Sequence, residues 1–262
     1  ESRVVVTDVT WQDIASAYRH VGPLTRPQTT RSTDAGAALT TFHMSASALP
    51  GEYTVGVSVR DAVTRKIGVY RRPVYISSYT SPDLMISDIR FASSVKPTIK
   101  RRGPFIRHGM EIIPNPTRTY ARNHPVYAYY ELYNLQQDQE GNTGFQTEVT
   151  VRSREETASP LDWRVVSGVG RFVNGDDQAL TFSMKDASKS AMTARYISLD
   201  LSDLPPGRYT VELMVNDLHT KRSVTKTANF AVTDEIAGQA PYASRWEASE
   251  PDSMKITASD PV

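Results

Sequence analysis

Residues 50–66 read Pro-Gly-Glu-Tyr-Thr-Val-Gly-Val-Ser-Val-Arg-Asp-Ala-Val-Thr-Arg-Lys, and residues 206–222 read Pro-Gly-Arg-Tyr-Thr-Val-Glu-Leu-Met-Val-Asn-Asp-Leu-His-Thr-Lys-Arg. The second stretch begins 156 residues after the first, and eight positions are identical without a gap. In both copies apolar residues alternate with polar or small ones, as in a strand with one buried face. Each copy therefore predicts a turn, a strand, a tight turn and a second strand, the closing hairpin of a β-sandwich.

Two of the repeated residue types indicate how each hairpin is built. Asp61 and Asp217 are each followed by a Thr and two basic residues, which is typical of a tight turn whose Asp accepts hydrogen bonds from backbone amides. Tyr53 and Tyr209 stand where the first strand of each hairpin begins. We expect these tyrosines to anchor the strands.

Strand-like periodicity continues through the rest of the chain. Apolar runs bounded by turn formers occupy residues 4–9, 84–91, 125–135, 145–151, 179–184, 195–201 and 223–232. Asn174-Gly175, between 171–173 and 178–182, is a hairpin signal because both residues tolerate positive φ. Residues 10–19 show roughly helical spacing, and a short helix, a strand or a turn all fit them.

Many short strands with frequent turns predict an all-β fold. Since each hairpin closes one sandwich, we predict two tandem β-sandwich domains of the Ig-like or fibronectin-like type. The first covers residues 1–80 and is short for a sandwich, so its opening strands are expected upstream. The second covers residues 83–234, and residues 235–262 are expected to form an extended or disordered C-terminal tail.

The composition excludes several classes of function. Lys and Arg total 30 against 29 Asp and Glu, so the net charge of +1 gives no overall reason to bind nucleic acid. No apolar run approaches the ~18 residues of a membrane-spanning helix, so the chain is not expected to span a membrane. Cysteine is absent, which excludes disulfides, thiol catalysis and Cys-based metal sites.

Motifs for catalysis and cofactor binding are missing as well. The chain has neither a Gly-x-Ser-x-Gly elbow nor a phosphate-binding glycine loop, and its five histidines form no zinc motif. We therefore predict no enzyme, no catalytic residue, no metal site and no cofactor. Carboxylates that meet only in space, among Glu111, Glu131 and Glu148, keep catalysis as the least favoured alternative.

A basic stretch is the first candidate binding feature. Lys100, Arg101, Arg102 and Arg107, with Lys96 and His108 beside them, lie among the loop-forming residues Pro97, Gly103 and Pro104. These side chains could bind an anionic polymer, lipopolysaccharide phosphate or an acidic partner. The alternative is a solvated loop whose charges are offset elsewhere.

A tyrosine-rich strand is the second candidate. Because strand side chains alternate, Tyr127, Tyr129, Glu131 and Tyr133 would share one face, opposite Leu132. If the Leu132 face is buried, the tyrosines around Glu131 form a polar-aromatic strip of the kind that sugars or partner proteins contact. The alternative is that these rings pack beneath a covering loop.

Several short motifs in the second predicted domain resemble sequences of a known protein family. They are Ile86-Ser87-Asp88-Ile89, Pro114-Asn115-Pro116, the tyrosine-rich residues 127–135, and residues 204–209. Together they resemble the C-terminal β-rich region of GWxTD-domain proteins, although the Gly-Trp-x-Thr-Asp motif itself is absent. The resemblance implies an exported, envelope-associated protein of a Bacteroidota-like bacterium. It implies an extracytoplasmic location, in the periplasm, at the outer membrane or on the cell surface.

These observations favour a non-catalytic structural or protein-interaction module of a larger exported bacterial surface protein. We expect it to act through sheet-edge and loop contacts, with a protein partner or with itself, and the tail of residues 235–262 could take part in assembly. The main alternative is a carbohydrate-binding β-sandwich that uses an exposed tyrosine strip.

Overall fold

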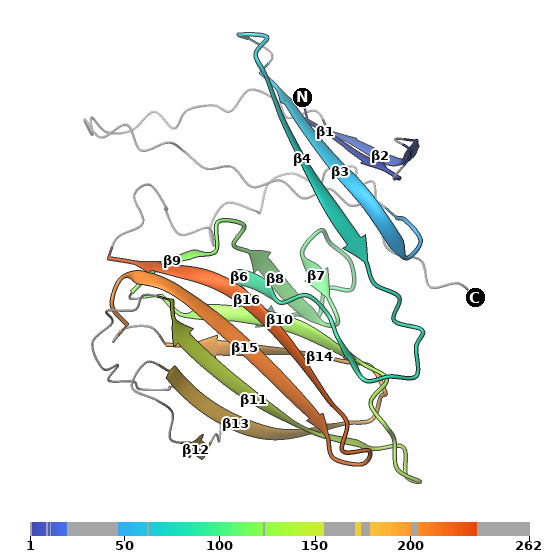
Figure 1. Ribbon diagram of the computed structural model, residues 1–262, viewed down its shortest axis with the longest axis vertical. Helices are drawn as coiled ribbons and strands as arrows, with labels where there is room; N and C mark the ends of the chain where they lie inside the picture. The colour runs from blue at the N-terminus through green and yellow to red at the C-terminus, as the bar shows by residue number, and fades with distance from the viewer. Residues whose placement is uncertain are drawn as a thin grey trace. The chain divides into compact units, whose positions relative to one another are not determined.

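The computed structural model describes residues 2–8, 10, 12–19, 47–61, 63–122, 124–154, 171–173, 179–200 and 204–234. Within these ranges the chain forms sixteen strands in three sheets and no helix (Figure 1). The prediction of an all-β fold is confirmed at that level. The chain divides into two compact units between Thr80 and Ser81, and each unit is considered by itself.

The first unit contains one antiparallel sheet, sheet A, in the order β2-β1-β3-β4. Its strands are β1 (Ser2–Thr7), β2 (Asp13–Arg19), β3 (Gly51–Arg60) and β4 (Ile67–Ile76). The helical alternative for residues 10–19 is wrong, because β2 pairs with β1 from Asp13 to Arg19, with a register shift that leaves out Ile14. The Asp8 carboxylate accepts hydrogen bonds from the amides of Thr10 at 2.8 Å and Gln12 at 2.9 Å, which turns the chain into a hairpin.

The second unit contains two sheets, B and C. Sheet B has the order β14-β10-β6-β8-β7, with β5 also paired to β10, and sheet C has the order β12-β13-β11-β15-β16-β9. All pairings are antiparallel except that of β9 with β16. The strands of sheet B are β5 (Met85–Ile86), β6 (Arg90–Pro97), β7 (Ile106–Arg107), β8 (Met110–Pro114), β10 (Val126–Tyr133) and β14 (Thr193–Leu199). The strands of sheet C are β9 (Thr119–Ala121), β11 (Thr143–Ser153), β12 (Arg171–Val173), β13 (Ala179–Ser188), β15 (Gly207–Asp217) and β16 (Ser223–Thr233).

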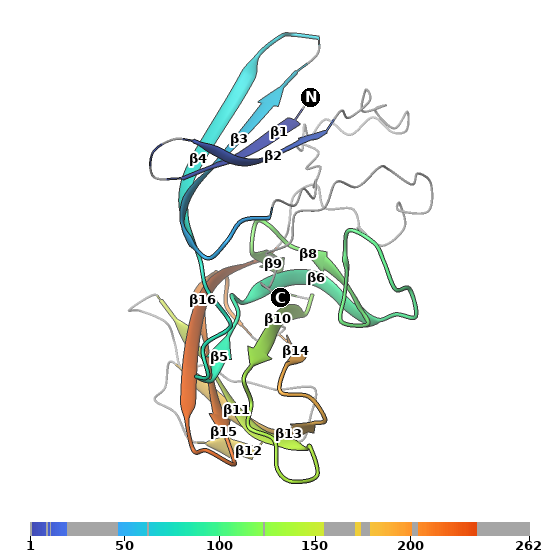
Figure 2. The ribbon, with the colours of Figure 1, turned by 90° about the vertical axis from the view of Figure 1, so that its right-hand side faces the viewer.

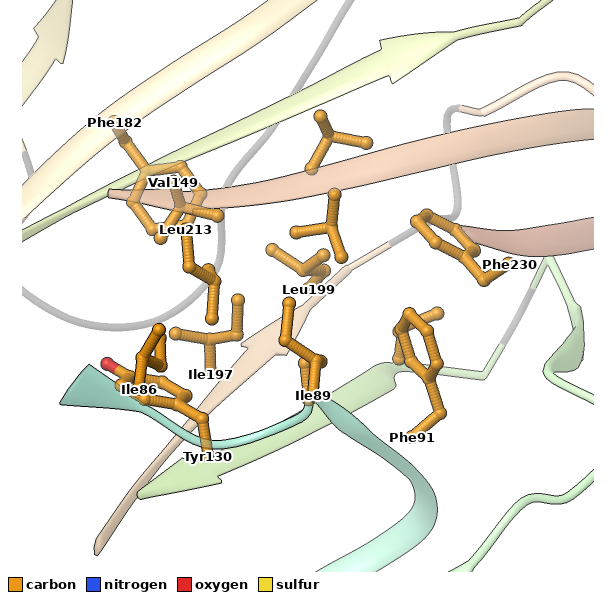
Figure 3. Packing of buried hydrophobic residues seen from close by; sticks show 14 of the residues in the cluster. Ile86, Ile89, Phe91, Tyr130, Val149, Phe182, Ile197, Leu199, Leu213 and Phe230 are labelled. Atoms are coloured by element: carbon orange, nitrogen blue, oxygen red, sulfur yellow. The ribbon is translucent and has the colours of Figure 1, made fainter. Parts of the chain in front are cut away.

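The main core of the second unit lies between sheets B and C. Figure 3 shows Tyr130 and Ile197 of sheet B facing Val149, Leu213 and Phe182 of sheet C. Each of these side chains is buried and belongs to one continuous apolar cluster. Burial of this apolar surface is the main force that holds the two sheets together.

Sheet B is also packed on its other face. It bends along β6, where the register with β8 shifts between Ala92 and Ser94 (Figure 2). The bend gathers Ala92, Val95 and Ile112 around Tyr129 in a second, smaller apolar cluster. As a result β10, which carries the tyrosine-rich sequence, is largely buried on both faces.

The repeated sequence forms the same hairpin in both units. β3 pairs with β4 from Gly51↔Ile76 to Arg60↔Ile67, and β15 pairs with β16 in the equivalent register. Asp61 accepts hydrogen bonds from the amides of Val63 at 2.7 Å and Thr64 at 3.1 Å. The predicted turn is therefore confirmed in the first copy.

The second copy repeats these contacts almost atom for atom. Asp217 accepts hydrogen bonds from the amides of His219 at 2.8 Å and Thr220 at 3.1 Å. Arg65 and Lys221, four residues after each Asp, have φ of 61° and 62°. The Tyr209 hydroxyl donates to the Pro205 carbonyl at 2.7 Å, so this tyrosine anchors the strand start as expected.

The two copies differ in what covers them. In the second unit Tyr209, Val211, Leu213 and Val215 are buried beneath sheet B. In the first unit the equivalent Tyr53, Val55 and Val57 are half-buried and Val59 is exposed. The local sequence therefore sets the hairpin, while the surroundings set its burial.

Two predicted features fall partly or wholly outside the described residues. β12 and β13 pair antiparallel, so the two predicted segments do form a hairpin, but Val173 lies opposite Thr181, which leaves more residues between the strands than a two-residue turn has. The Asn174-Gly175 turn itself lies outside the described residues. The tail, residues 235–262, also lies outside them.

The repeated Asp residues offer a matched test of burial. Asp217 is 1% exposed and also accepts a hydrogen bond from the Gln136 amide at 2.7 Å, whereas Asp61 is exposed and, among the described residues, accepts hydrogen bonds within its own turn. We expect Asp217→Ala to lower the free energy of unfolding by about 3 kcal/mol, because the backbone amides of His219, Thr220 and Gln136 all lose their hydrogen-bond acceptor. Urea unfolding should show a clearly smaller loss of unfolding free energy for Asp61→Ala. Equal losses for the two variants would contradict a larger structural role for the buried Asp217.

Candidate functional site

The tyrosine-rich face of β10 is covered. Leu132, on the opposite face, is fully buried in the main core, so Tyr127, Tyr129, Glu131 and Tyr133 do share the second face. However, Tyr129 is 2% and Glu131 3% exposed, and the two flanking tyrosines are only partly exposed. The expectation of an exposed strip is therefore wrong at its centre, because the bend in sheet B brings a hairpin turn over Glu131.

The Glu131 carboxylate is surrounded by hydrogen-bond donors. The Tyr129 hydroxyl donates to Oε1 at 2.7 Å, Arg107 Nε donates to the same oxygen at 2.5 Å, and the Tyr133 hydroxyl donates to Oε2. Arg107 Nη2 also donates to Oε2 at 3.4 Å, and His108 Nε2 lies 3.5 Å from Oε1. We call these five residues, Arg107, His108, Tyr129, Glu131 and Tyr133, the Glu131 cluster.

A tight turn brings Arg107 and His108 to this carboxylate. Arg107 pairs with Met110 across a two-residue loop in which His108 has a φ of 46° and Gly109 a φ of 73°. Positive φ at both positions is characteristic of a type I′ hairpin turn. The Thr98 amide donates to the Gly109 carbonyl at 2.8 Å, which fixes this turn to the end of β6.

Glu131 is held through its backbone as well. Its amide donates to Ser87 Oγ at 3.0 Å, and its carbonyl accepts from the Ser87 amide at 2.9 Å. Ser87 follows β5, the short strand that pairs with the end of β10. The first resemblance motif, residues 86–89, therefore fixes the backbone of the residue at the centre of the cluster.

The surroundings of Glu131 favour its ionised form. Burial alone would raise the pKa of Glu131, but hydrogen bonds from Tyr133, Tyr129 and Arg107 outweigh it, so its pKa lies below the usual range. Burial, together with the hydrogen bond to Glu131, raises the pKa of Tyr129, and the hydroxyl stays protonated.

Two arginines face this single carboxylate. Burial lowers the pKa of Arg107, but its hydrogen bond and attraction to Glu131 outweigh that effect, so its pKa is raised. Arg90 lies opposite Tyr129 in the neighbouring strand, and burial and repulsion by Arg107 lower its pKa. Chemically, the Glu131 cluster is a buried charge clamp whose carboxylate oxygens are already bonded to the protein.

The basic stretch is divided between two environments. Arg107 belongs to the Glu131 cluster, whereas Lys100, Arg101 and Arg102 are exposed in the loop between β6 and β7. The two candidate features predicted from the sequence are therefore joined through Arg107. Sequence reasoning missed the roles of Ser87, Arg90 and His108, and only the His108-Gly109 pair carries a local signal, that of a tight turn.

The second resemblance motif, residues 114–116, connects the two sheets. Asn115 is buried; its Nδ2 donates to the Thr119 carbonyl at 2.9 Å, and its Oδ1 accepts from Thr117 Oγ1 at 2.7 Å. These bonds close the turn between β8 of sheet B and β9 of sheet C. The motif therefore has a structural role in positioning β9.

Metal ligands do not gather in the part of the chain that the structure describes, since no group of three or more His, Asp or Glu side chains meets there. No protein-family model matches this chain, and no curated protein matches it either.

Removal of the charge on Glu131 should destabilise the second unit at neutral pH. We expect Glu131→Gln to lower the free energy of unfolding by roughly 2–4 kcal/mol, because Arg107 loses its buried counter-ion. The loss should shrink in acid. Because the pKa of Glu131 is lower in the folded protein than its ordinary value near 4.5, the ionised carboxylate stabilises the fold above about pH 4.5. This stabilisation is lost as the pH falls through the folded-state pKa.

Chemical denaturation from pH 7 down to pH 3 checks this expectation. Glu148→Gln is the matched control, because Glu148 lies half-buried in β11 away from the Glu131 cluster. A Glu131→Gln deficit that stays constant over this pH range would contradict an ionised clamp.

Proposed function

We propose that this chain is a non-catalytic structural or protein-interaction module of a larger exported bacterial envelope or surface protein. It associates with a protein partner, in the simplest case a second copy of itself, through a sheet edge of the first unit. The carrying observation is the exposed apolar surface of the edge strand β4.

β4 lies at one end of sheet A and, among the strands that the structure describes, pairs with β3 alone. Ile67, Val69, Tyr70 and Tyr75 on this strand are between 54% and 69% exposed. An edge strand carries backbone hydrogen-bonding groups that can pair with another strand, and exposed apolar side chains favour such pairing. Pro73 and the basic pair Arg71 and Arg72 limit uncontrolled pairing along the same strand.

The internal repeat supports the view that the apolar face of the first hairpin packs against another layer. The hairpin of the second unit is buried under sheet B, whereas its copy in the first unit leaves Val59 exposed and Val55 and Val57 half-buried. Since the two hairpins have matched sequences and registers, we infer that the first unit is one layer of a tandem β-sandwich arrangement. A partner or an upstream segment would then complete it.

The envelope setting rests on the resemblance of residues 83–232 to GWxTD-domain proteins. The described residues include no helix capable of spanning a bilayer. The Glu131 cluster supports a structural role for the one buried carboxylate on the tyrosine face, because its oxygens already accept bonds from Tyr129, Tyr133 and Arg107. The burial of Tyr129 and Glu131 weighs against the carbohydrate-binding alternative.

Light scattering during size exclusion tests the proposal. The intact chain should form a concentration-dependent oligomer, and Val69→Lys should shift it toward monomer because a charge on the edge strand disfavours strand pairing. Val63→Lys is the matched control, since Val63 is exposed but lies in the turn after β3, outside the strand.

A chain that ends at Asp234 separates the contribution of the tail. If truncation abolishes the oligomer and Val69→Lys retains it, assembly depends on residues 235–262 and not on β4. A monomer at every concentration for the intact chain would contradict self-association.

A further inference from the structure

The loop between β6 and β7 carries an exposed apolar residue among cations. Ile99 is 99% exposed, and it is followed by Lys100, Arg101 and Arg102, all exposed. Figure 2 shows the loop extending beyond the strand ends of sheet B. An isoleucine with almost no contact to its own protein, next to three cations, is an arrangement that has to be explained.

The positive charges at the loop tip are not offset nearby. Residues 89–110 contain six Lys or Arg and no Asp or Glu. Arg107 is bound to Glu131, and Lys96 lies opposite Glu111 across the β6–β8 pair. Lys100, Arg101 and Arg102 make no ion pair with any residue that the structure describes, whereas Arg122, Arg195, Arg222 and Lys226 each do.

The base of the loop is fixed by hydrogen bonds to β8 and the turn before it. The Thr98 amide binds the Gly109 carbonyl at 2.8 Å, and the Ile112 amide binds the Phe105 carbonyl at 2.8 Å. Arg107 adds its bonds to the buried Glu131. Because both ends are held, the tip presents Ile99 and the three cations without a large loss of conformational entropy on binding.

We propose that this loop docks on an anionic phospholipid surface, with Ile99 entering the interface and Lys100, Arg101 and Arg102 contacting the lipid phosphates. A protruding loop with one apolar side chain and a cationic collar matches a planar surface whose interior accepts any apolar group. A protein partner would instead have to provide a pocket shaped for a single isoleucine. The site is independent of the β4 edge, so its failure would leave the self-association proposal untouched.

Vesicle co-sedimentation of the intact chain tests the proposal. The chain should bind vesicles of phosphatidylcholine mixed with phosphatidylglycerol, should not bind phosphatidylcholine alone, and should dissociate at high salt. The double variant Arg101→Gln, Arg102→Gln should weaken binding by roughly 25-fold, at about fivefold for each basic residue. Ile99→Ser should weaken it by about threefold or more, because the apolar contact is lost.

The double variant Lys185→Gln, Lys189→Gln is the matched control. It removes the same charge from exposed positions of the second unit outside the loop and should bind as the unaltered chain does. Fluorescence of Ile99→Trp should shift to shorter wavelength on anionic vesicles if the tip enters the interface.

Three results would overturn the proposal. They are no binding to anionic vesicles, equal weakening by the loop and control variants, and binding to soluble polyglutamate as tight as to vesicles with no effect of Ile99→Ser. The last result would identify the loop as a site for acidic polymers instead of lipid.

Discussion

Burial of β10 on both faces is the constraint on which the second unit depends. One face supplies Leu132 and Tyr130 to the main core, and the other lies under the bent part of sheet B. An acidic residue in such a strand is tolerable only with close donors, and Glu131 has two tyrosine hydroxyls and Arg107. The ion pair of Glu131 with Arg107 also fixes the base of the loop between β6 and β7. The Glu131 carboxylate therefore connects the core to this exposed loop.

The internal repeat shows how far local sequence determines this structure. Strand alternation and the Asp61 and Asp217 turns were predictable because they depend on residues within one hairpin. The Glu131 cluster was not, since Arg107 belongs to a two-residue strand with no periodicity and lies 24 positions from its partner. Residues 10–19 were ambiguous because helical and strand spacing coincide over so short a run, and pairing with β1 decided between them.

The two hairpins also separate conformation from burial. Equivalent residues adopt the same register and the same positive φ in both units, yet sheet B buries the apolar face of the second copy, whereas the same positions of the first copy are half-buried or exposed. The exposed first copy therefore reveals what the sequence alone specifies, and the buried copy what packing adds. The exposed Asp61 and the buried Asp217 are opposite outcomes of one repeated sequence.

The parallel pairing of β9 with β16 has a consequence for the order of folding. Ala231, Val232 and Thr233 pair with Thr119, Tyr120 and Ala121, so this contact joins the beginning of sheet C to its last strand. During synthesis β9 emerges more than a hundred residues before its partner, as the separation of 112 between Arg122 and Asp234 illustrates. β9 can join sheet C only after β16 has emerged from the ribosome. Until then β9 has no strand partner in the nascent chain.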